Sequence, residues 1–355
     1  MNEPHAMQSA VSPEAAATRQ AFYRRINGEH MAPLWEVLKG LVPPEPRPTP
    51  RTHIWRYDAL RPFFLEAASL LTADEAERRV LVLENPAFAG KSRATATLYA
   101  GIQIVLPGEV APAHRHTASA LRFVLESSGG FTAVSGERTT MRTGDFVITP
   151  SWAWHDHGND SKDPIVWMDV LDLPIVNFFE GGFSEHYNDK SQTIDRPEGD
   201  SLARYGGGLL PIEGHGPFGK TSPIFSYPFD RTSKALAAIA AAGNLDPHWA
   251  ATLRYSNPID GGWAMPTIAS WMTHLPAGTA TQTMRSTDGI VIAVAEGRGF
   301  ARIGDERIPF GPRDVLVVPN WTQRSFHAET DCFLFCCSDR VAQEKLGIWR
   351  EERNA

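Results

Sequence analysis

The chain repeats itself, and this self-similarity constrains its fold more than any other feature. A stretch beginning at Asn85 is matched by one beginning at Asn257, and the offset between the copies stays close to 170 residues. Farther along, three positions of the first copy, Asp145, Pro150 and Trp152, fall on Asp314, Pro319 and Trp321 of the second. Each copy consists of short runs rich in Val, Ile and aromatic residues, separated by Gly, Pro, Asp and Ser, which is typical of β-barrels. The sequence therefore predicts a duplicated β-barrel.

The rest of the 355 residues is arranged around these two barrels. We expect the barrels at 79–187 and 251–345, a helical segment and connector at 1–78, a linker at 188–250 and a tail at 346–355. In the first segment, Ser12 and Pro13 predict a helix start, and the helix is expected to run toward residues 33–41. A proline-rich connector at 42–51, a helix at 58–71 and a capping box at 72–75 follow. Within the linker, "TSKALAAIAAAG" predicts a helix capped by Thr232 or Ser233 that stops at Gly243.

The overall composition limits the kinds of partner that this chain can have. Its formal net charge of −7 argues against binding to nucleic acid or to anionic membranes, because both need a cationic face. No apolar run approaches the roughly 18 residues of a membrane span, and the first residues lack the order of a signal peptide. We therefore expect a cytoplasmic protein with a small-molecule partner. The three cysteines, Cys332, Cys336 and Cys337, lie in one short run and are expected to be buried apolar fillers.

Two His-x-His pairs in the first copy carry the strongest chemical signal. His114 and His116 stand on one expected strand, and His155 and His157 stand near the end of another. Residues two apart on a strand point to the same face, so each pair can place two imidazoles side by side. We prefer a metal site over four separately satisfied core histidines. Imidazole suits Fe, Zn, Cu or Ni, and the lack of nearby thiolates disfavours a structural zinc site, so the sequence leaves the metal open.

Arg122 follows the first pair by six residues and shares its parity. An unbroken strand would place its guanidinium on the metal-facing side. A buried arginine must be paired, and its fork fits a carboxylate in two-point contact. We therefore expect Arg122 to bind an anionic substrate. The alternative is a structural ion pair with an aspartate or glutamate.

The second copy serves as an internal control for these residues. At offsets of about 170, the four histidines His114, His116, His155 and His157 become Met284, Ser286, Arg324 and Phe326. Likewise, Arg122 falls on Ile292 and Gln103 falls on Thr273. The Gly, Pro, Asp and Trp positions that shape the fold persist, while the chemical residues are replaced. We infer one metal per chain, in the N-terminal barrel.

The spacings around the histidines match a known family. Gly108 with His114 and His116 resembles the first cupin motif, and the residues Gly144, Pro150, His155 and Asn159 resemble the second. The glutamate ligand usual in the first motif is replaced here by Ala120 or Leu121, which leaves coordination positions open for substrate and O2. The segments "ERRVLVLENP", "TLYAGIQIVLPGEVAPAHRHTASALRFVLE", "GERTTMRTGDFVITPSWAWHDHGN" and "WMDVLDLP" resemble the gentisate 1,2-dioxygenases, whose relatives cleave salicylate or 1-hydroxy-2-naphthoate. The resemblance implies a mainly β bicupin, with two double-stranded β-helix (jelly-roll) barrels and an N-terminal helical segment.

The resemblance also implies a reaction and a site. It implies Fe(II) on His114, His116 and His155, with O2 and an aromatic carboxylate as reactants, maleylpyruvate as the product of gentisate, and a homotetramer. Further pocket residues are implied, with Arg78, Gln103 and Arg122 at the substrate and His157 and Asp169 in catalysis. Two of these residues have a structural role as the alternative: Gln103 could be a core amide, and Asp169 could anchor a strand end. For Arg78, the alternative is that its neighbour Arg79 is the residue that matches the family position.

Tyr99 bears on the choice of substrate, because a phenol in the pocket could bond the second hydroxyl of gentisate, which salicylate lacks. The alternative is a tyrosine ring packed in the barrel wall.

Two other functions remain open. One is cleavage of salicylate or 1-hydroxy-2-naphthoate, and the other is metal binding without catalysis.

Overall fold

The computed structural model describes residues 12–213 and 219–354, which fall into two units divided between Arg47 and Pro48. The first unit holds α1 (Pro13–Gly28) and α2 (Leu34–Leu41). The Ser12 hydroxyl accepts a hydrogen bond from the Ala15 amide at 3.2 Å, so the predicted helix start is confirmed. The single long helix expected here is wrong. The chain leaves helical geometry after Gly28, with φ of +57° at His30, and Pro33 precedes the second helix.

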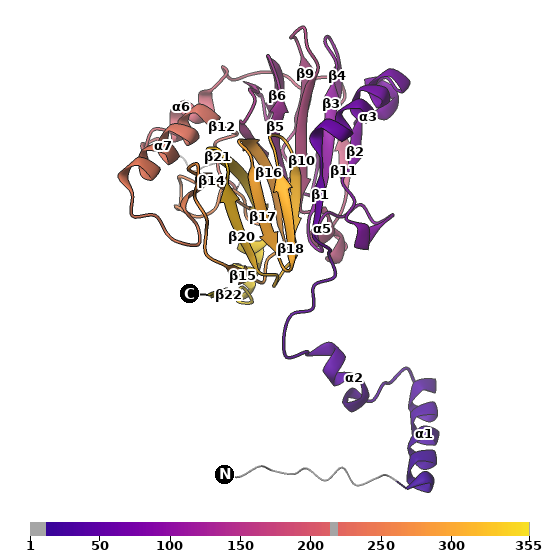
Figure 1. Cartoon of the computed structure of the whole chain (residues 1–355). Coiled ribbons are helices and arrows are strands. Elements are labelled where there is room, and N and C mark those ends of the chain that lie inside the picture. Colours follow the sequence, from indigo (N-terminus) through magenta and orange to yellow (C-terminus); the bar gives the residue numbers. More distant parts are fainter. Residues whose placement is uncertain (1–11, 214–218, 355) are drawn as a thin grey trace. The chain divides into compact units, whose positions relative to one another are not determined.

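The second unit contains two barrels, each made of one six-stranded and one five-stranded antiparallel sheet (Figure 1). The first barrel consists of β2 (Val80–Val82), β3 (Tyr99–Val105), β4 (Val110–His116), β5 (Ala120–Glu126), β6 (Gly130–Val134), β7 (Glu137–Thr140), β8 (Phe146–Thr149), β9 (His155–Asn159), β10 (Ile165–Leu171), β11 (Ser184–His186) and β12 (Ser226–Tyr227). The second consists of β1 (His53–Trp55), β13 (Ala251–Arg254), β14 (Ala269–Leu275), β15 (Met284–Ser286), β16 (Ile290–Glu296), β17 (Gly299–Ile303), β18 (Glu306–Phe310), β19 (Val315–Val318), β20 (Arg324–Ala328), β21 (Cys332–Ser338) and β22 (Glu351–Arg353). The prediction of a mainly β chain with two barrels is confirmed.

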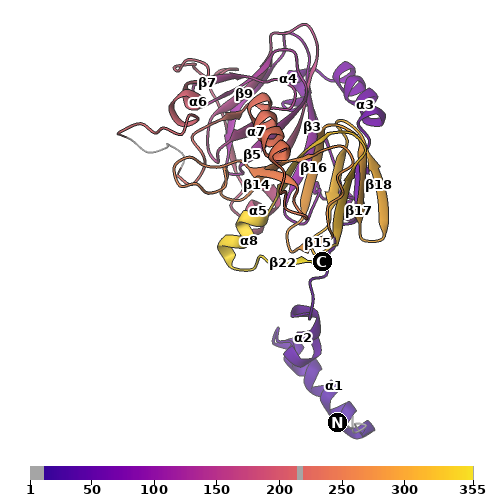
Figure 2. The same cartoon turned by 60° about the vertical axis from the view of Figure 1, so that its left-hand side comes forward.

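Short helices connect and cover the strands of this unit. They are α3 (Tyr57–Leu70), α4 (Ala73–Ala76), the 3-10 turn η1 (Pro86–Phe88), α5 (Leu173–Phe178), α6 (Asp200–Tyr205), α7 (Phe229–Ala242) and α8 (Arg340–Leu346). Helix α3 packs on β3, and α7 packs on β13 and β14 (Figure 2). The capping box is confirmed, because the Thr72 amide donates to the Glu75 carboxylate and the Glu75 amide donates to the Thr72 hydroxyl. In the described part of the chain, no helix is both long and apolar enough to cross a membrane.

Each copy gives one short strand to the barrel of the other. Strand β1 precedes the first barrel in sequence but pairs with β19 of the second, and β12 precedes the second barrel but pairs with β8 of the first. Asp314 accepts a hydrogen bond from the Tyr57 amide at the start of α3, and Asp145 accepts one from the Phe229 amide at the start of α7, both at 2.9 Å. Asp145 and Asp314, which match each other in the repeat, therefore make the same contact. Each accepts a hydrogen bond from the first amide of the helix that follows an exchanged strand. The structural copies begin near residues 53 and 226, earlier than the boundaries expected from the strand pattern.

A continuous apolar core joins the two barrels. Buried side chains from the six-stranded sheets of both barrels form one cluster, in which Phe123 and Phe335 stack with ring centroids 4.5 Å apart. This shared core and the exchanged strands explain why residues from Pro48 onward form one compact unit.

Three smaller expectations can be compared with the structure. Helix α7 begins at Phe229 without a side-chain cap rather than at Thr232 or Ser233. It ends at Ala242, and Gly243 follows as the C-cap with φ of +72°, as predicted. The expected tail contains β22, which pairs with β15 and so belongs to the second barrel. All three cysteines are free and buried in β21, as expected.

Candidate metal centre and substrate pocket

Three histidines from two strands of the first barrel meet at one point. His114 and His116 come from β4, and His155 comes from β9, where it lies directly opposite His114 in the antiparallel register. One ring nitrogen from each of the three lies within 4.8 Å of the others. The structure therefore brings together all three predicted metal ligands.

The hydrogen bonds of these histidines suit metal binding. A carbonyl oxygen can only accept, so His116 Nδ1 must donate to the Ala118 carbonyl at 2.7 Å and His155 Nδ1 to the Ala153 carbonyl at 2.9 Å. Each Nε2 is then unprotonated and available to a metal. Burial lowers the pKa of all three imidazoles, and burial together with the Arg78 guanidinium lowers the pKa of His114 to about 2. Three neutral imidazoles fit a divalent transition metal.

A cavity of about 260 Å³ opens beside the three histidines. All nine predicted site residues line it: Arg78, Tyr99, Gln103, His114, His116, Arg122, His155, His157 and Asp169. Apolar side chains complete the lining, including Val80, Leu171 and Leu173. The size and mixed lining are appropriate for a small aromatic ligand with a few polar groups.

Arg122 reaches this cavity from a different strand than the sequence suggested. Strand β4 ends at His116, and β5, which carries Arg122, begins at Ala120 and belongs to the six-stranded sheet. The parity argument along one unbroken strand is therefore wrong. The guanidinium still lies near the histidines, because the two sheets of the barrel face each other and both line the cavity.

Polar partners hold Arg122 on several sides although the residue is only 3% exposed. Its Nη1 donates to Thr149 Oγ1 at 2.5 Å, and its Nη2 lies 3.1 Å from His157 Nε2. Its Nε lies 3.5 Å from the Asp169 carboxylate, and this nitrogen has no hydrogen-bond partner. The ion pair considered as the alternative is thus present, and the same guanidinium also lines the cavity.

His157 is held in one orientation by a threonine. Thr132 Oγ1 donates to the Asp156 carbonyl at 3.1 Å, so at the 2.8 Å contact with His157 it accepts from Nδ1. The Nε2 of His157 is then free to accept from Arg122. Burial and the nearby Arg122 charge lower the pKa of His157 well below its ordinary value, which keeps the ring neutral.

Thr132 and Thr149 are two residues of this network that the spacing of the histidines does not reveal. The repeat itself contains the signal that could have found them. Thr132 lies opposite His157 across β6 and β9, and the equivalent pair in the second barrel is Ala301 opposite Phe326. Thr149 falls on Val318. Both hydroxyls are therefore present only in the barrel that contains the histidines and Arg122.

Three further predicted residues surround the guanidinium. Asp169 accepts a hydrogen bond from Trp167 Nε1 at 2.9 Å, and burial raises the pKa of its carboxyl to about 6, although Arg122 opposes the shift. Gln103 is buried, and its Nε2 has no hydrogen-bond partner. Burial and the Asp169 charge raise the pKa of Tyr99, so its phenol stays protonated. Gln103 and Tyr99 thus offer hydrogen-bonding groups to a ligand in the cavity.

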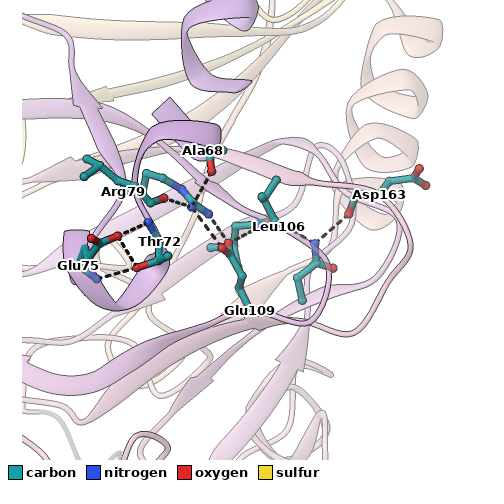
Figure 3. A network of polar contacts seen from close by, with 10 residues as sticks. Ala68, Thr72, Glu75, Arg79, Leu106, Glu109 and Asp163 are labelled. Carbon is teal, nitrogen blue, oxygen red and sulfur yellow. Dashed lines mark hydrogen bonds and ion pairs between the residues drawn. The ribbon is translucent and has the colours of Figure 1, made fainter. Parts of the chain in front are cut away.

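The neighbouring residues Arg78 and Arg79 have different roles: Arg78 lines the pocket, and Arg79 stabilises the surrounding structure. Arg78 lines the cavity, contacts His114 Nδ1 and donates to the Pro112 carbonyl at 2.5 Å. Arg79 instead forms a buried ion pair with Glu109 and donates to the Leu71 carbonyl at 2.7 Å, in the network shown in Figure 3. Glu109 in turn accepts from the Leu106 amide. Arg79 therefore ties the end of α3 to the β3–β4 turn, and Arg78 is the arginine of the pocket.

Comparisons with known proteins agree with this geometry. A family model described as "Cupin domain" matches residues 101–171. The chain is 51% identical to "Gentisate 1,2 dioxygenase 1" of Aquipseudomonas alcaligenes, over 98% of this chain and 100% of that protein. It is 38% identical to "Gentisate 1,2-dioxygenase" of Streptomyces sp, over 91% and 92% of the two chains. Among solved structures, salicylate 1,2-dioxygenase from Pseudoaminobacter salicylatoxidans, as adducts with gentisate, matches with a TM-score of 0.89 and 33% identity, over 99% of this chain and 96% of that one.

Proposed function

The chain belongs to the gentisate 1,2-dioxygenase family of cupin-fold, ring-cleaving dioxygenases, and from that premise we propose that it converts gentisate and O2 to maleylpyruvate. The ring opens between the carbon that bears the carboxylate and the neighbouring carbon that bears the 2-hydroxyl, and both oxygen atoms enter the product. The observation that carries this proposal is the convergence of His114, His116 and His155 beside a cavity with buried cationic and hydrogen-bonding groups.

We propose Fe(II) as the metal, with one ion per chain in the first barrel. The donor set supports it. Two of the three imidazoles donate from Nδ1 to backbone carbonyls, so their Nε2 lone pairs are available to the metal. Ala120 and Leu121 stand where the motif usually has a glutamate ligand, and neither can bind metal. When bound, Fe(II) would supply Lewis acidity and bring substrate and O2 together on one ion.

Arg122, Arg78 and Gln103 would bind the substrate carboxylate. Arg122 and Arg78 provide two cationic groups on the cavity wall, and the Gln103 amide has an unpaired donor there. Thr149 and Asp169 hold the Arg122 guanidinium in place before substrate arrives. This preorganisation lowers the cost of orienting the carboxylate.

His157 would bond the substrate 2-hydroxyl, or shuttle its proton, at Nε2, in place of the hydrogen bond that Nε2 accepts from Arg122. Thr132 fixes the ring with the proton on Nδ1, which leaves the Nε2 lone pair facing Arg122 and the cavity. Asp169 would assist by orienting Arg122. Both groups therefore act on the hydroxyl and carboxylate that the substrate uses to bind.

Tyr99 supports gentisate over salicylate as the preferred substrate. Its protonated phenol lines the cavity and can bond the hydroxyl that salicylate lacks. The test compares turnover of gentisate, salicylate and 1-hydroxy-2-naphthoate by the same Fe(II)-loaded sample. Negligible turnover of gentisate beside clear turnover of another substrate would overturn this choice.

A metal-binding bicupin without catalysis is the remaining alternative function. Oxygen uptake by iron-loaded protein with gentisate, followed by the absorbance of the ring-opened product and by metal analysis, separates the two. A sample that contains one iron per chain yet consumes no oxygen with any of the three substrates would end the enzyme proposal. On the family resemblance we also propose a homotetramer, which sedimentation would test. The cytoplasmic location stays a prediction.

A further inference from the structure

The second barrel places a positive charge where the first barrel places its histidines. Met284 lies opposite Arg324 across β15 and β20, as His114 lies opposite His155 across β4 and β9. Arg324 thus occupies the strand position of a metal ligand. Its Nη1 donates to Ser286 Oγ at 3.0 Å, and Ser286 stands at the position equivalent to His116.

The Arg324 guanidinium is buried with part of its hydrogen-bonding capacity unused. The residue is 4% exposed, and its Nη2 has no hydrogen-bond partner. None of the ion pairs found among the described residues includes Arg324, and Asp288 and Glu351 are the acidic groups whose charges act on it. A buried guanidinium donor without a partner is costly, which favours a polar or anionic occupant beside it.

A small cavity is lined in part by Arg324. It measures about 30 Å³, against about 260 Å³ in the first barrel, because Trp249, Trp271 and Phe326 narrow it. Since a cavity needs about 10–15 Å³ to hold one water, this one has room for an occupant of two or three non-hydrogen atoms and excludes an aromatic ring. His248 also lines it, and its Nδ1 is a second buried polar atom without a partner.

We propose that this cavity of the second barrel binds a small monovalent anion, of the size of a halide or formate, through Arg324 Nη2. The guanidinium supplies the charge and a free donor, His248 can supply a second donor, and the aromatic walls set the upper limit on size. Neutral water would satisfy the donor but leave the buried charge without a direct counter-ion, which is why we favour an anion. The site uses none of the residues of the first barrel and so stands independently of the ring-cleavage proposal.

Bromide provides a direct test, because its anomalous scattering distinguishes it from water. Crystals of the full chain grown with sodium bromide should show a bromide peak at hydrogen-bond distance from Arg324 Nη2. In solution, bromide and formate at about physiological ionic strength should change the fluorescence of Trp249 and Trp271 and raise the melting temperature by on the order of 2–4 °C. Sulfate at matched ionic strength should do neither, because it is too large for the cavity.

Two variants separate specific binding from general salt effects. Arg324→Gln should lose the bromide peak and the anion-dependent shift, whereas Arg302→Gln, an exposed arginine on β17 of the same barrel, should keep both. If Arg324→Gln fails to fold, the wild-type crystal and the sulfate comparison still decide the question. Three outcomes would each overturn the proposal. They are a cavity that holds only water, bromide binding at crystal concentration only, and equal anion-dependent shifts of the melting temperature in both variants.

Discussion

The two barrels share a framework at the rim and differ at the centre. In the first, the Arg115 guanidinium lies 4.5 Å above the Trp152 ring and the Trp152 amide donates to the His116 carbonyl. In the second, Arg285 lies 4.4 Å above Trp321 and the Trp321 amide donates to the Ser286 carbonyl. The histidines, Arg122 and the two threonines have no polar equivalents in the second barrel except Ser286 and Arg324.

The difference between the barrels separates the residues that serve the fold from those that serve chemistry. Strand register and the helix-binding aspartates persist in both barrels, so selection for folding alone accounts for them. The central cavity shrinks from about 260 to about 30 Å³ where the polar residues are lost. A polar set that appears in only one of two otherwise equivalent barrels is therefore a functional set, and four predictions test that inference.

Removal of a metal ligand should have the largest effect. His114→Ala takes away one of three imidazoles, so the protein should lose both bound iron and turnover together. Metal analysis and oxygen uptake with gentisate measure the two losses. His327→Ala, which removes a histidine from β20 of the second barrel, should change neither. Full activity of His114→Ala would contradict the assignment of the metal to the first barrel.

Loss of Arg122, whose position in the second barrel holds Ile292, should have the next largest effect. Arg122→Gln should raise KM for gentisate by about a hundredfold or more while iron remains bound, because a buried charge partner for the carboxylate is gone. Arg79→Gln provides the matched comparison, since it breaks the framework ion pair with Glu109. It should lower the melting temperature and leave KM nearly unchanged. An unchanged KM in Arg122→Gln would show that Arg122 does not bind the substrate and serves only in its ion pair with Asp169.

The buried Asp169 should make the stability of the chain depend on pH. Its folded-state pKa of about 6 lies above the ordinary 3.8, so the folded state binds the proton more tightly than the unfolded state does. As pH rises from 4 to 6, this group alone should lower the free energy of unfolding by about 2 kcal/mol. Denaturant titrations of wild type and Asp169→Asn at both pH values isolate the contribution of this carboxyl group. Parallel pH profiles for the two proteins would refute it.

Loss of the threonine behind His157 should have the smallest effect of the four. Thr132→Val keeps the shape but removes the acceptor for His157 Nδ1, so kcat should fall about tenfold with little change in KM. Thr132→Ser restores the hydroxyl and should recover most of the rate. Thr139→Val, on the neighbouring strand opposite Thr132, makes the same change away from His157 and should be silent. Equal rates for Thr132→Val and Thr132→Ser would show that the hydroxyl is not needed.

Much of the fold could be predicted because its determinants are local or repeated. Short runs rich in Val, Ile and aromatic residues indicated strands, Ser12, Thr72 and Gly243 marked helix ends, and the offset of about 170 residues revealed the duplication. The metal ligands were predictable for the same reason. Residues two apart on one strand share a face, so His114 and His116 follow from sequence spacing alone.

Other features depended on which strands meet in space. The two- and three-residue strands β12 and β1 are too short to show a periodic pattern, so their exchange between barrels was not predicted. Thr132 contacts His157 only because β6 pairs with β9 in one particular register, and sequence spacing does not encode that pairing.

The duplication, the β class and the residues available for chemistry follow from the sequence alone, because they depend on residue type and on spacing along one strand. The folded arrangement was needed to establish that Arg122 enters the pocket from the opposite sheet, that Arg78 rather than Arg79 lines it, and that Arg324 replaces a metal ligand with a buried cation. These outcomes depend on how distant strands pack face to face, and that packing is fixed by the folded chain as a whole.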